Sequence, residues 1–188
     1  MGHIKAYYER ITELSQRDWR YIAARFERIS FNKGYVLTKQ GRFEQFLYFI
    51  EQGIVRYYIP DDERELTFNF CFPKEFASAY DSLLTQAPSE YQLETLMDTV
   101  AWRISRKDLQ DIYANTEAGN AIGRCVAERI YLMKSKRELS LLQQTAKERY
   151  LSLFADQPEI IRHIPLKYIA SYIGITPQAL SRIRREIC

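Results

Sequence analysis

The apolar residues of this 188-residue chain change their spacing twice, and this limits the folds open to it. Up to about residue 26 they recur every three or four positions, as in amphipathic helices, and Ser15 is placed to cap the second helix. From residue 29 to residue 104 the period falls to two, which is typical of half-buried strands. After Ser105, a further capping residue, helical spacing returns. The pattern predicts an α+β protein with its sheets in the first two thirds of the chain.

The middle segment consists of short strand-like runs with turn residues between them. Leu66, Phe68 and Phe70 alternate with more polar neighbours, and Gln40-Gly41 and Gln52-Gly53 have turn chemistry. Many short strands with regular turns predict an antiparallel sandwich or barrel. The expected strands cover residues 29–31, 35–39, 46–50, 54–59, 65–72, 91–97 and 100–104.

Histidine and cysteine are too scarce for most enzymes. The only histidines are His3 and His163, too few for a metal centre built on two or three imidazole ligands. Cys71, Cys125 and Cys188 are far apart and odd in number, so no disulfide framework is expected. We therefore expect a binding protein with no metal, no cofactor and no catalytic residues. The lack of histidine ligands also disfavours an enzyme on a cupin-like barrel.

The sequence has no apolar run approaching the ~18 residues that a membrane span needs. Its first ten residues carry charges where a signal peptide would be apolar. These features predict a cytoplasmic protein.

Positive charge is concentrated toward the C-terminus. The formal net charge is +3. Residues 1–116 contain 15 Lys+Arg against 17 Asp+Glu, whereas residues 117–188 contain 12 against 7. Any polyanionic partner is therefore expected at the C-terminal end.

A long helix is expected over residues 117–141, with an apolar stripe of Ile122, Val126, Ile130 and Met133. Two interpretations of the stripe stay open. It packs on the protein's own barrel, or it also forms the seam of a homodimer.

Residues 166–186 have the spacing of a helix-turn-helix. Ala170 is small where the helices would cross, and Gly174 supplies the positive φ of the turn. Leu180 faces the first helix, while Thr176 and Pro177 suit the start of the second.

The exposed face of the second helix would carry Gln178, Ser181, Arg182 and Arg185, which are side chains that read bases and hold phosphates. We expect Arg182 to reach a guanine, and Arg184 and Arg185 to hold phosphate. The full expected DNA-binding set is Thr176, Pro177, Gln178, Ser181, Arg182, Arg184, Arg185 and Lys167. The alternative is a ligand-sensing or protein-interaction module in which the helical hairpin binds no DNA.

With these motifs the chain resembles the Crp/Fnr family of bacterial transcription regulators. The resemblance rests on Gly34-Tyr35, Gly41, Leu47-Tyr48-Phe49-Ile50, Gly53 and Arg56, together with the helix-turn-helix. It implies a cyclic-nucleotide-binding-like β-roll (a cupin-like jelly roll) at residues 1–116, a dimerisation helix at 117–141 and a DNA-binding domain at 142–188. It also implies a homodimer on a near-palindromic double-stranded DNA operator, with RNA polymerase as a further candidate partner.

The chain departs from the family where cyclic AMP would bind. Ser78-Ala79 and Ser89-Glu90 stand where the family's cyclic AMP binders have Gly-Glu and Arg-Ser. Without the arginine a cyclic phosphate loses its main charge-assisted contact, so no response to cyclic AMP is expected. An effector, if there is one, would meet Tyr80, Ser82, Ser89 and Glu90. A roll filled by its own aromatic side chains is the alternative.

Overall fold

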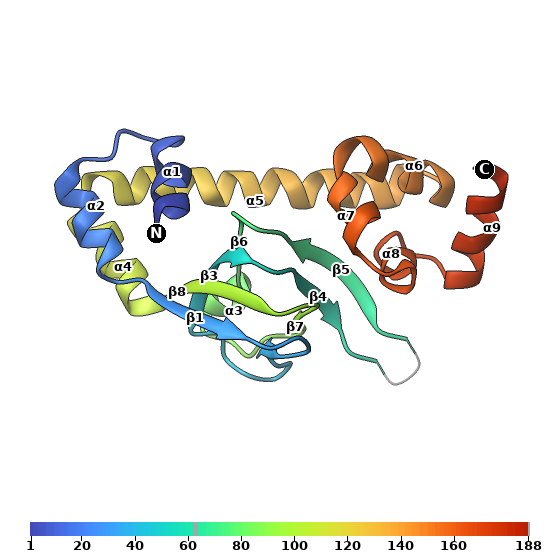
Figure 1. Ribbon diagram of the computed structural model, residues 1–188, viewed down its shortest axis with the longest axis horizontal. Coiled ribbons are helices and arrows are strands. Elements are labelled where there is room, and N and C mark those ends of the chain that lie inside the picture. Colours follow the sequence, from blue (N-terminus) through green and yellow to red (C-terminus); the bar gives the residue numbers. More distant parts are fainter. Residues whose placement is uncertain (62–63, 188) are drawn as a thin grey trace. The chain divides into compact units, whose positions relative to one another are not determined.

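The computed structural model describes residues 1–61 and 64–187, and it confirms the predicted α+β class (Figure 1). Within these residues two four-stranded sheets form the roll, and a long helix and smaller helices follow. The roll and its flanking helices comprise α1 (Gly2–Glu9), α2 (Gln16–Ala23), β1 (Glu27–Phe31), β2 (Val36–Thr38), β3 (Phe46–Gln52), β4 (Val55–Ile59), β5 (Leu66–Cys71), β6 (Phe76–Ala77), α3 (Tyr80–Thr85), β7 (Gln92–Thr95), β8 (Thr99–Ser105) and α4 (Arg106–Asn115). The remaining helices are α5 (Glu117–Gln143), α6 (Ala146–Asp156), α7 (Pro158–His163), α8 (Leu166–Tyr172) and α9 (Pro177–Ile187).

The strands lie close to their expected positions. One sheet has the order β1-β8-β3-β6 and the other β2-β7-β4-β5. β8 is antiparallel to both its neighbours, so that Ala101 lies opposite Ile29 on one side and Ile50 on the other. The two-residue strand β6 was not predicted, because so short a segment shows no alternation.

The described residues form two compact units. The first contains residues 1–57 and 70–129, and the second combines the hairpin around residues 58–69 with residues from 130 onward. In the first unit, α1, α2, α4 and the start of α5 bury their apolar faces against the roll. Ile22, Phe49, Ile104, Leu109 and Ile122 are members of this core.

Side-chain caps fix where the helices begin. The predicted caps are confirmed: Ser15 Oγ accepts a hydrogen bond from Asp18 N at 3.0 Å, and Ser105 Oγ accepts one from Asp108 N at 3.0 Å. Thr145 forms a full capping box with Glu148 at the start of α6, which the sequence reading did not single out.

The N-terminal part of the predicted apolar stripe on α5 packs on the protein's own core. Ile122 lies in the core of the first unit, and Val126 packs against that core. Ile130 is half-buried, whereas Met133 is 47% exposed. Ile122 is therefore not accessible to a partner while the first unit is folded.

The opposite face of α5 exposes a second set of apolar side chains. At about 100° per residue, Leu132 and Leu139 lie about 160–180° around the helix from Ile130, and Leu142 lies about 160° from Ile122. Their exposed fractions are 66%, 49% and 76%. Among the described residues, no helix is both long enough and apolar enough to cross a membrane.

Gly53 joins β3 to β4 at a point of close backbone approach. Its φ is +108°, and a Cβ atom built there would lie 2.2 Å from Thr99 Oγ1 and 2.8 Å from Thr99 Cα. Gly41 also has positive φ, at +78°, but a Cβ there would meet nothing within 4 Å. Only at Gly53 does a side chain both strain the backbone and overlap a neighbouring strand.

We therefore predict that Gly53→Ala destabilises the protein more than Gly41→Ala. The free energy of unfolding of the Gly41 variant should fall by about 1–2 kcal/mol, which is the cost of a left-handed conformation for alanine. The Gly53 variant should lose more, because Thr99 must also move. Urea unfolding monitored by tryptophan fluorescence measures both, and equal losses would contradict the predicted overlap.

Candidate nucleic-acid interface

Helices α8 and α9 pack through a small apolar core in the second unit. Ile169, Ala170, Ile173 and Leu180 are almost fully buried there, at the positions that the helix-turn-helix spacing predicted. The pair lies near the C-terminal end of the chain (Figure 1, red).

The turn between α8 and α9 is closed by its own backbone. Gly174 has φ +79°, as predicted. Its N–H donates to Ser171 O at 3.0 Å, and Ile175 N donates to Ala170 O at 2.9 Å. These two bonds form a Schellman motif, which ends α8 and sets the direction in which α9 starts.

Two arginines from other helices support the C-terminal end of α8. Arg137 of α5 donates to Tyr172 O at 2.8 Å, and its guanidinium carbon lies 4.1 Å from the centre of the Tyr172 ring. Arg149 of α6 donates through Nε to Ile173 O at 2.9 Å. Cations are favourable at a helix C-terminus, where carbonyl groups lack partners. The sequence reading missed both, since no local pattern links them to α8.

The start of β5 and the residues just before it also contact α8 within the second unit. Ser171 Oγ donates to Glu65 O at 2.8 Å and accepts from Thr67 N at 2.8 Å. Arg64 donates to Ile175 O in the turn. These contacts hold α8 and the turn from several sides, which fixes where α9 starts.

All the predicted DNA-binding side chains are exposed. Thr176 caps α9 by accepting a hydrogen bond from Ala179 N at 3.2 Å, and Lys167 Nζ lies 4.6 Å from the centre of the Tyr168 ring. Glu186, the acidic residue of α9, pairs with Lys147 at 3.5 Å. The exposed set on α8, α9 and the turn is Lys167, Thr176, Pro177, Gln178, Ser181, Arg182, Arg184 and Arg185.

The four expected effector-pocket residues have different surroundings in the first unit. Ser82 Oγ donates to Ala87 O at 2.6 Å and Ser89 Oγ donates to Tyr91 O at 2.8 Å, and both serines are buried. Tyr80 packs against the core, whereas Glu90 is exposed. The structure therefore places the two serines inside the protein and leaves Glu90 at the surface.

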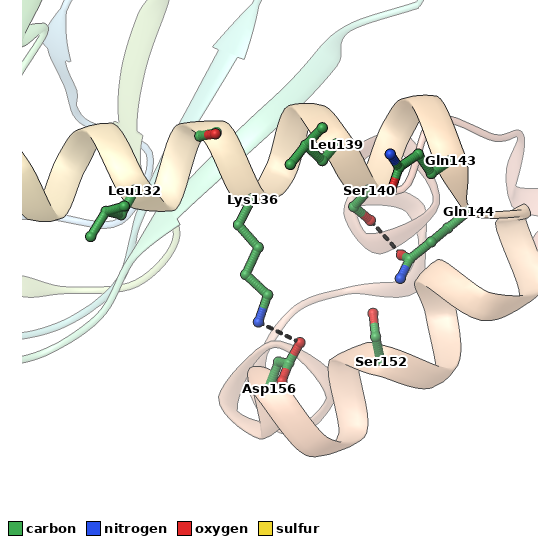
Figure 2. Close-up of a pocket in the computed structure, with 9 residues that line it drawn as sticks. Leu132, Lys136, Leu139, Ser140, Gln143, Gln144, Ser152 and Asp156 are labelled. Carbon is green, nitrogen blue, oxygen red and sulfur yellow. Dashed lines mark hydrogen bonds and ion pairs between the residues drawn. The ribbon is translucent and has the colours of Figure 1, made fainter.

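A groove of about 410 Å³ lies between α5 and α6 in the second unit. Lys136 reaches across it to Asp156, with 3.0 Å between Nζ and Oδ2 (Figure 2). Both side chains are largely exposed, so the groove has no buried charge with which to recognise a ligand. In the part of the chain that the structure describes, no cluster of His, Cys, Asp and Glu could hold a metal ion.

The sequence of the roll matches one protein family. Residues 28–116 match the cyclic nucleotide-binding domain family. A search of curated protein sequences finds no match for this chain.

Solved structures share the fold over most of the chain. FixK2 from Bradyrhizobium japonicum has a TM-score of 0.73 at 17% identity, with 86% of this chain and 84% of that one covered. A putative Crp/Fnr-family transcriptional regulator from Eubacterium rectale has a TM-score of 0.72 at 17% identity, covering 93% and 83%. The regulator CLP from Xanthomonas campestris has a TM-score of 0.69 at 18% identity, covering 92% and 91%.

The predicted resemblance is thereby confirmed. The family match covers residues 28–116, and over most of its length the chain has the fold of solved regulators such as the Crp/Fnr-family protein from Eubacterium rectale.

We predict that Thr176→Ala weakens the first turn of α9 by about 1 kcal/mol, because Ala179 N loses its acceptor. Thr176→Ser keeps the hydroxyl and is the matched control. Hydrogen exchange at the Ala179 amide should quicken in the alanine variant alone. Similar exchange in all three proteins would show that Thr176 does not act as a cap.

Proposed function

We propose that this protein is a homodimeric, sequence-specific DNA-binding regulator of transcription. The observation that carries the proposal is the exposed face of α9, where Gln178, Ser181, Arg182 and Arg185 project from a helix held by the Schellman turn, Arg137 and Arg149. A helix fixed in this way can enter the major groove with its side chains already positioned. Such a regulator works in the cytoplasm, with RNA polymerase as a further candidate partner.

Each basic residue has a distinct task in this proposal. Arg182 lies in the middle of the exposed face and reaches a guanine edge with two hydrogen bonds. Arg184, Arg185 and Lys167 contact phosphates, which fixes the position of α9 without reading sequence. The start of α9 adds backbone N–H groups, which favour an anion. A role in regulation, though not the task of each residue, is supported by two proteins of the same fold, one described as a Crp/Fnr-family transcriptional regulator and the other as a global regulator.

The dimer is proposed to form through α5. Leu132, Ser135, Leu139 and Leu142 follow the alternating three- and four-residue spacing of a coiled-coil seam. The three leucines are largely exposed in the single chain, and a second copy would cover them. Two copies would then present two α9 helices to half-sites about 34 Å apart on a near-palindrome.

The roll is proposed not to respond to cyclic AMP. Ala79 lacks the carboxylate and Ser89 the guanidinium expected of a cyclic AMP binder, and Ser89 already donates to Tyr91 O. Residues 76–89 also contain no Lys or Arg to balance a phosphate. CLP is described as responsive to c-di-GMP, another phosphate-bearing ligand. We expect a neutral or cationic effector for the present chain, or none.

Arg182→Ala should reduce affinity for the preferred operator by about 1–3 kcal/mol for each half-site and relax selection at one base position in each half-site. Selection from random DNA with the wild-type and variant proteins measures this. An unchanged consensus with unchanged affinity would rule out base reading by Arg182.

Arg185→Ala provides the contrast on the same helix. Loss of this phosphate contact in both copies should weaken all sequences alike and reduce the salt dependence by about two counterions for the dimer. The consensus from selection should stay the same. A changed consensus would instead make Arg185 a base-reading residue.

Leu139→Asp should dissociate the dimer, because the seam would have to bury an unpaired charge. Met133→Asp is the matched control, since Met133 is similarly exposed but lies on the other face of α5. Sedimentation equilibrium should give a monomer only for the Leu139 variant. A dimer that survives Leu139→Asp but not Met133→Asp would return the seam to the Ile122–Met133 stripe.

A further inference from the structure

Glu44 is a buried acidic residue in the first unit, in the segment between β2 and β3. Its exposed fraction is 3%. No ion pair to Glu44 is found among the described residues, and a buried charge without partners is costly. The carboxylate must therefore be stabilised by hydrogen-bond donors.

Four donors from three parts of the roll surround this carboxylate. Oε1 accepts from Gln45 N at 2.9 Å and from Phe46 N at 3.0 Å. Oε2 accepts from Thr38 Oγ1 and, at 3.3 Å, from Ala79 N. Burial raises the pKa of Glu44, while these donors act in the opposite direction. Each oxygen has two donors, which is the arrangement of an anion site.

Two contacts of Glu44, one through its carboxylate and one through its backbone N–H, fix the segment that begins α3. Ala79 is the residue immediately before α3, and its N–H is directed to Glu44. Glu44 N in turn donates to Ser82 Oγ at 3.0 Å. Glu44 therefore joins β2, the start of β3 and the start of α3 through a single side chain.

The neighbouring polar groups are also satisfied within the chain. Ser78 Oγ donates to Phe46 O at 2.9 Å, and Tyr91 OH donates to Asp81 Oδ1 at 2.5 Å. In the described part of the chain, no buried side-chain polar atom lacks a partner. The segment thus has no idle buried side-chain donor for an added anion.

We propose that the carboxylate of Glu44 is a built-in anionic ligand that holds residues 78–90 in one conformation and withholds the Ala79 N–H from any added phosphate. The inference deepens the proposed absence of a cyclic nucleotide response, and it rests on that proposal in taking residues 78–90 as the segment where a nucleotide would bind. Residues 78–90 of the roll then keep their conformation without an external anion.

Substitutions at Glu44 test whether the site needs an anion or only a hydrogen-bonding group of the same size, such as the amide of glutamine. In Glu44→Gln either orientation of the amide directs its NH₂ at one or two backbone N–H donors, so the melting temperature should fall. In Glu44→Ala the melting temperature should fall further. Added acetate should restore part of this loss saturably, whereas neutral acetamide should not. Glu27→Ala is the control, since Glu27 is a largely exposed glutamate of the same unit, paired with Arg103.

A Glu44→Gln protein as stable as the wild type, or equal effects of acetate and acetamide on Glu44→Ala, would overturn the proposal. If Glu44→Ala does not fold alone, its refolding yield in acetate against acetamide gives the same test. Cyclic AMP should leave the melting temperature of the wild type unchanged. A saturable rise in that melting temperature would refute the proposed absence of a nucleotide response. The stabilities of the wild type and Glu44→Gln would still test separately whether Glu44 acts as a built-in anion.

Discussion

The proposed function depends on one constraint, which is that α9 must be held rigidly while its polar face stays uncovered. A short helix with Arg182 and Arg185 on one side gains little from burial there, so Leu180 and the turn must fix its position. The Schellman bonds at Gly174 and Ile175 set the angle between α8 and α9. The guanidinium groups of Arg137 and Arg149 donate hydrogen bonds to carbonyl groups at the end of α8, which would otherwise need water as a partner. In the proposed function, these groups fix the position of α9 before it contacts DNA.

The roll shows the opposite use of polar groups. Around α9 charged side chains are exposed, whereas in the roll Glu44, Ser82 and Ser89 are buried and paired within the chain. A buried polar group that is fully bonded favours a single conformation, because breaking any one bond leaves a costly unpaired atom. On this account the second unit binds a partner, and the first unit is stabilised by its own residues.

Local features of the structure could be predicted from the sequence, and long-range ones could not. Ser15, Ser105 and Gly174 act as expected because caps and turns depend on a few neighbouring residues. The accessible face of α5 was not predictable, since Ile122 and Leu132 are both apolar and only tertiary packing decides which is buried. The contacts of Glu44 and Arg149 join residues distant in sequence, and no motif marks them.

Sequence-specific binding of DNA is the central claim, and the salt dependence of that binding tests it most directly. With three phosphate-binding side chains in each copy, a dimer should release about six counterions, so affinity for its selected operator should fall roughly a thousandfold between 50 and 200 mM salt. A scrambled duplex should bind far more weakly at every salt concentration. Equal affinity for both duplexes, or binding that does not change with salt, would contradict the account and favour a module that binds protein.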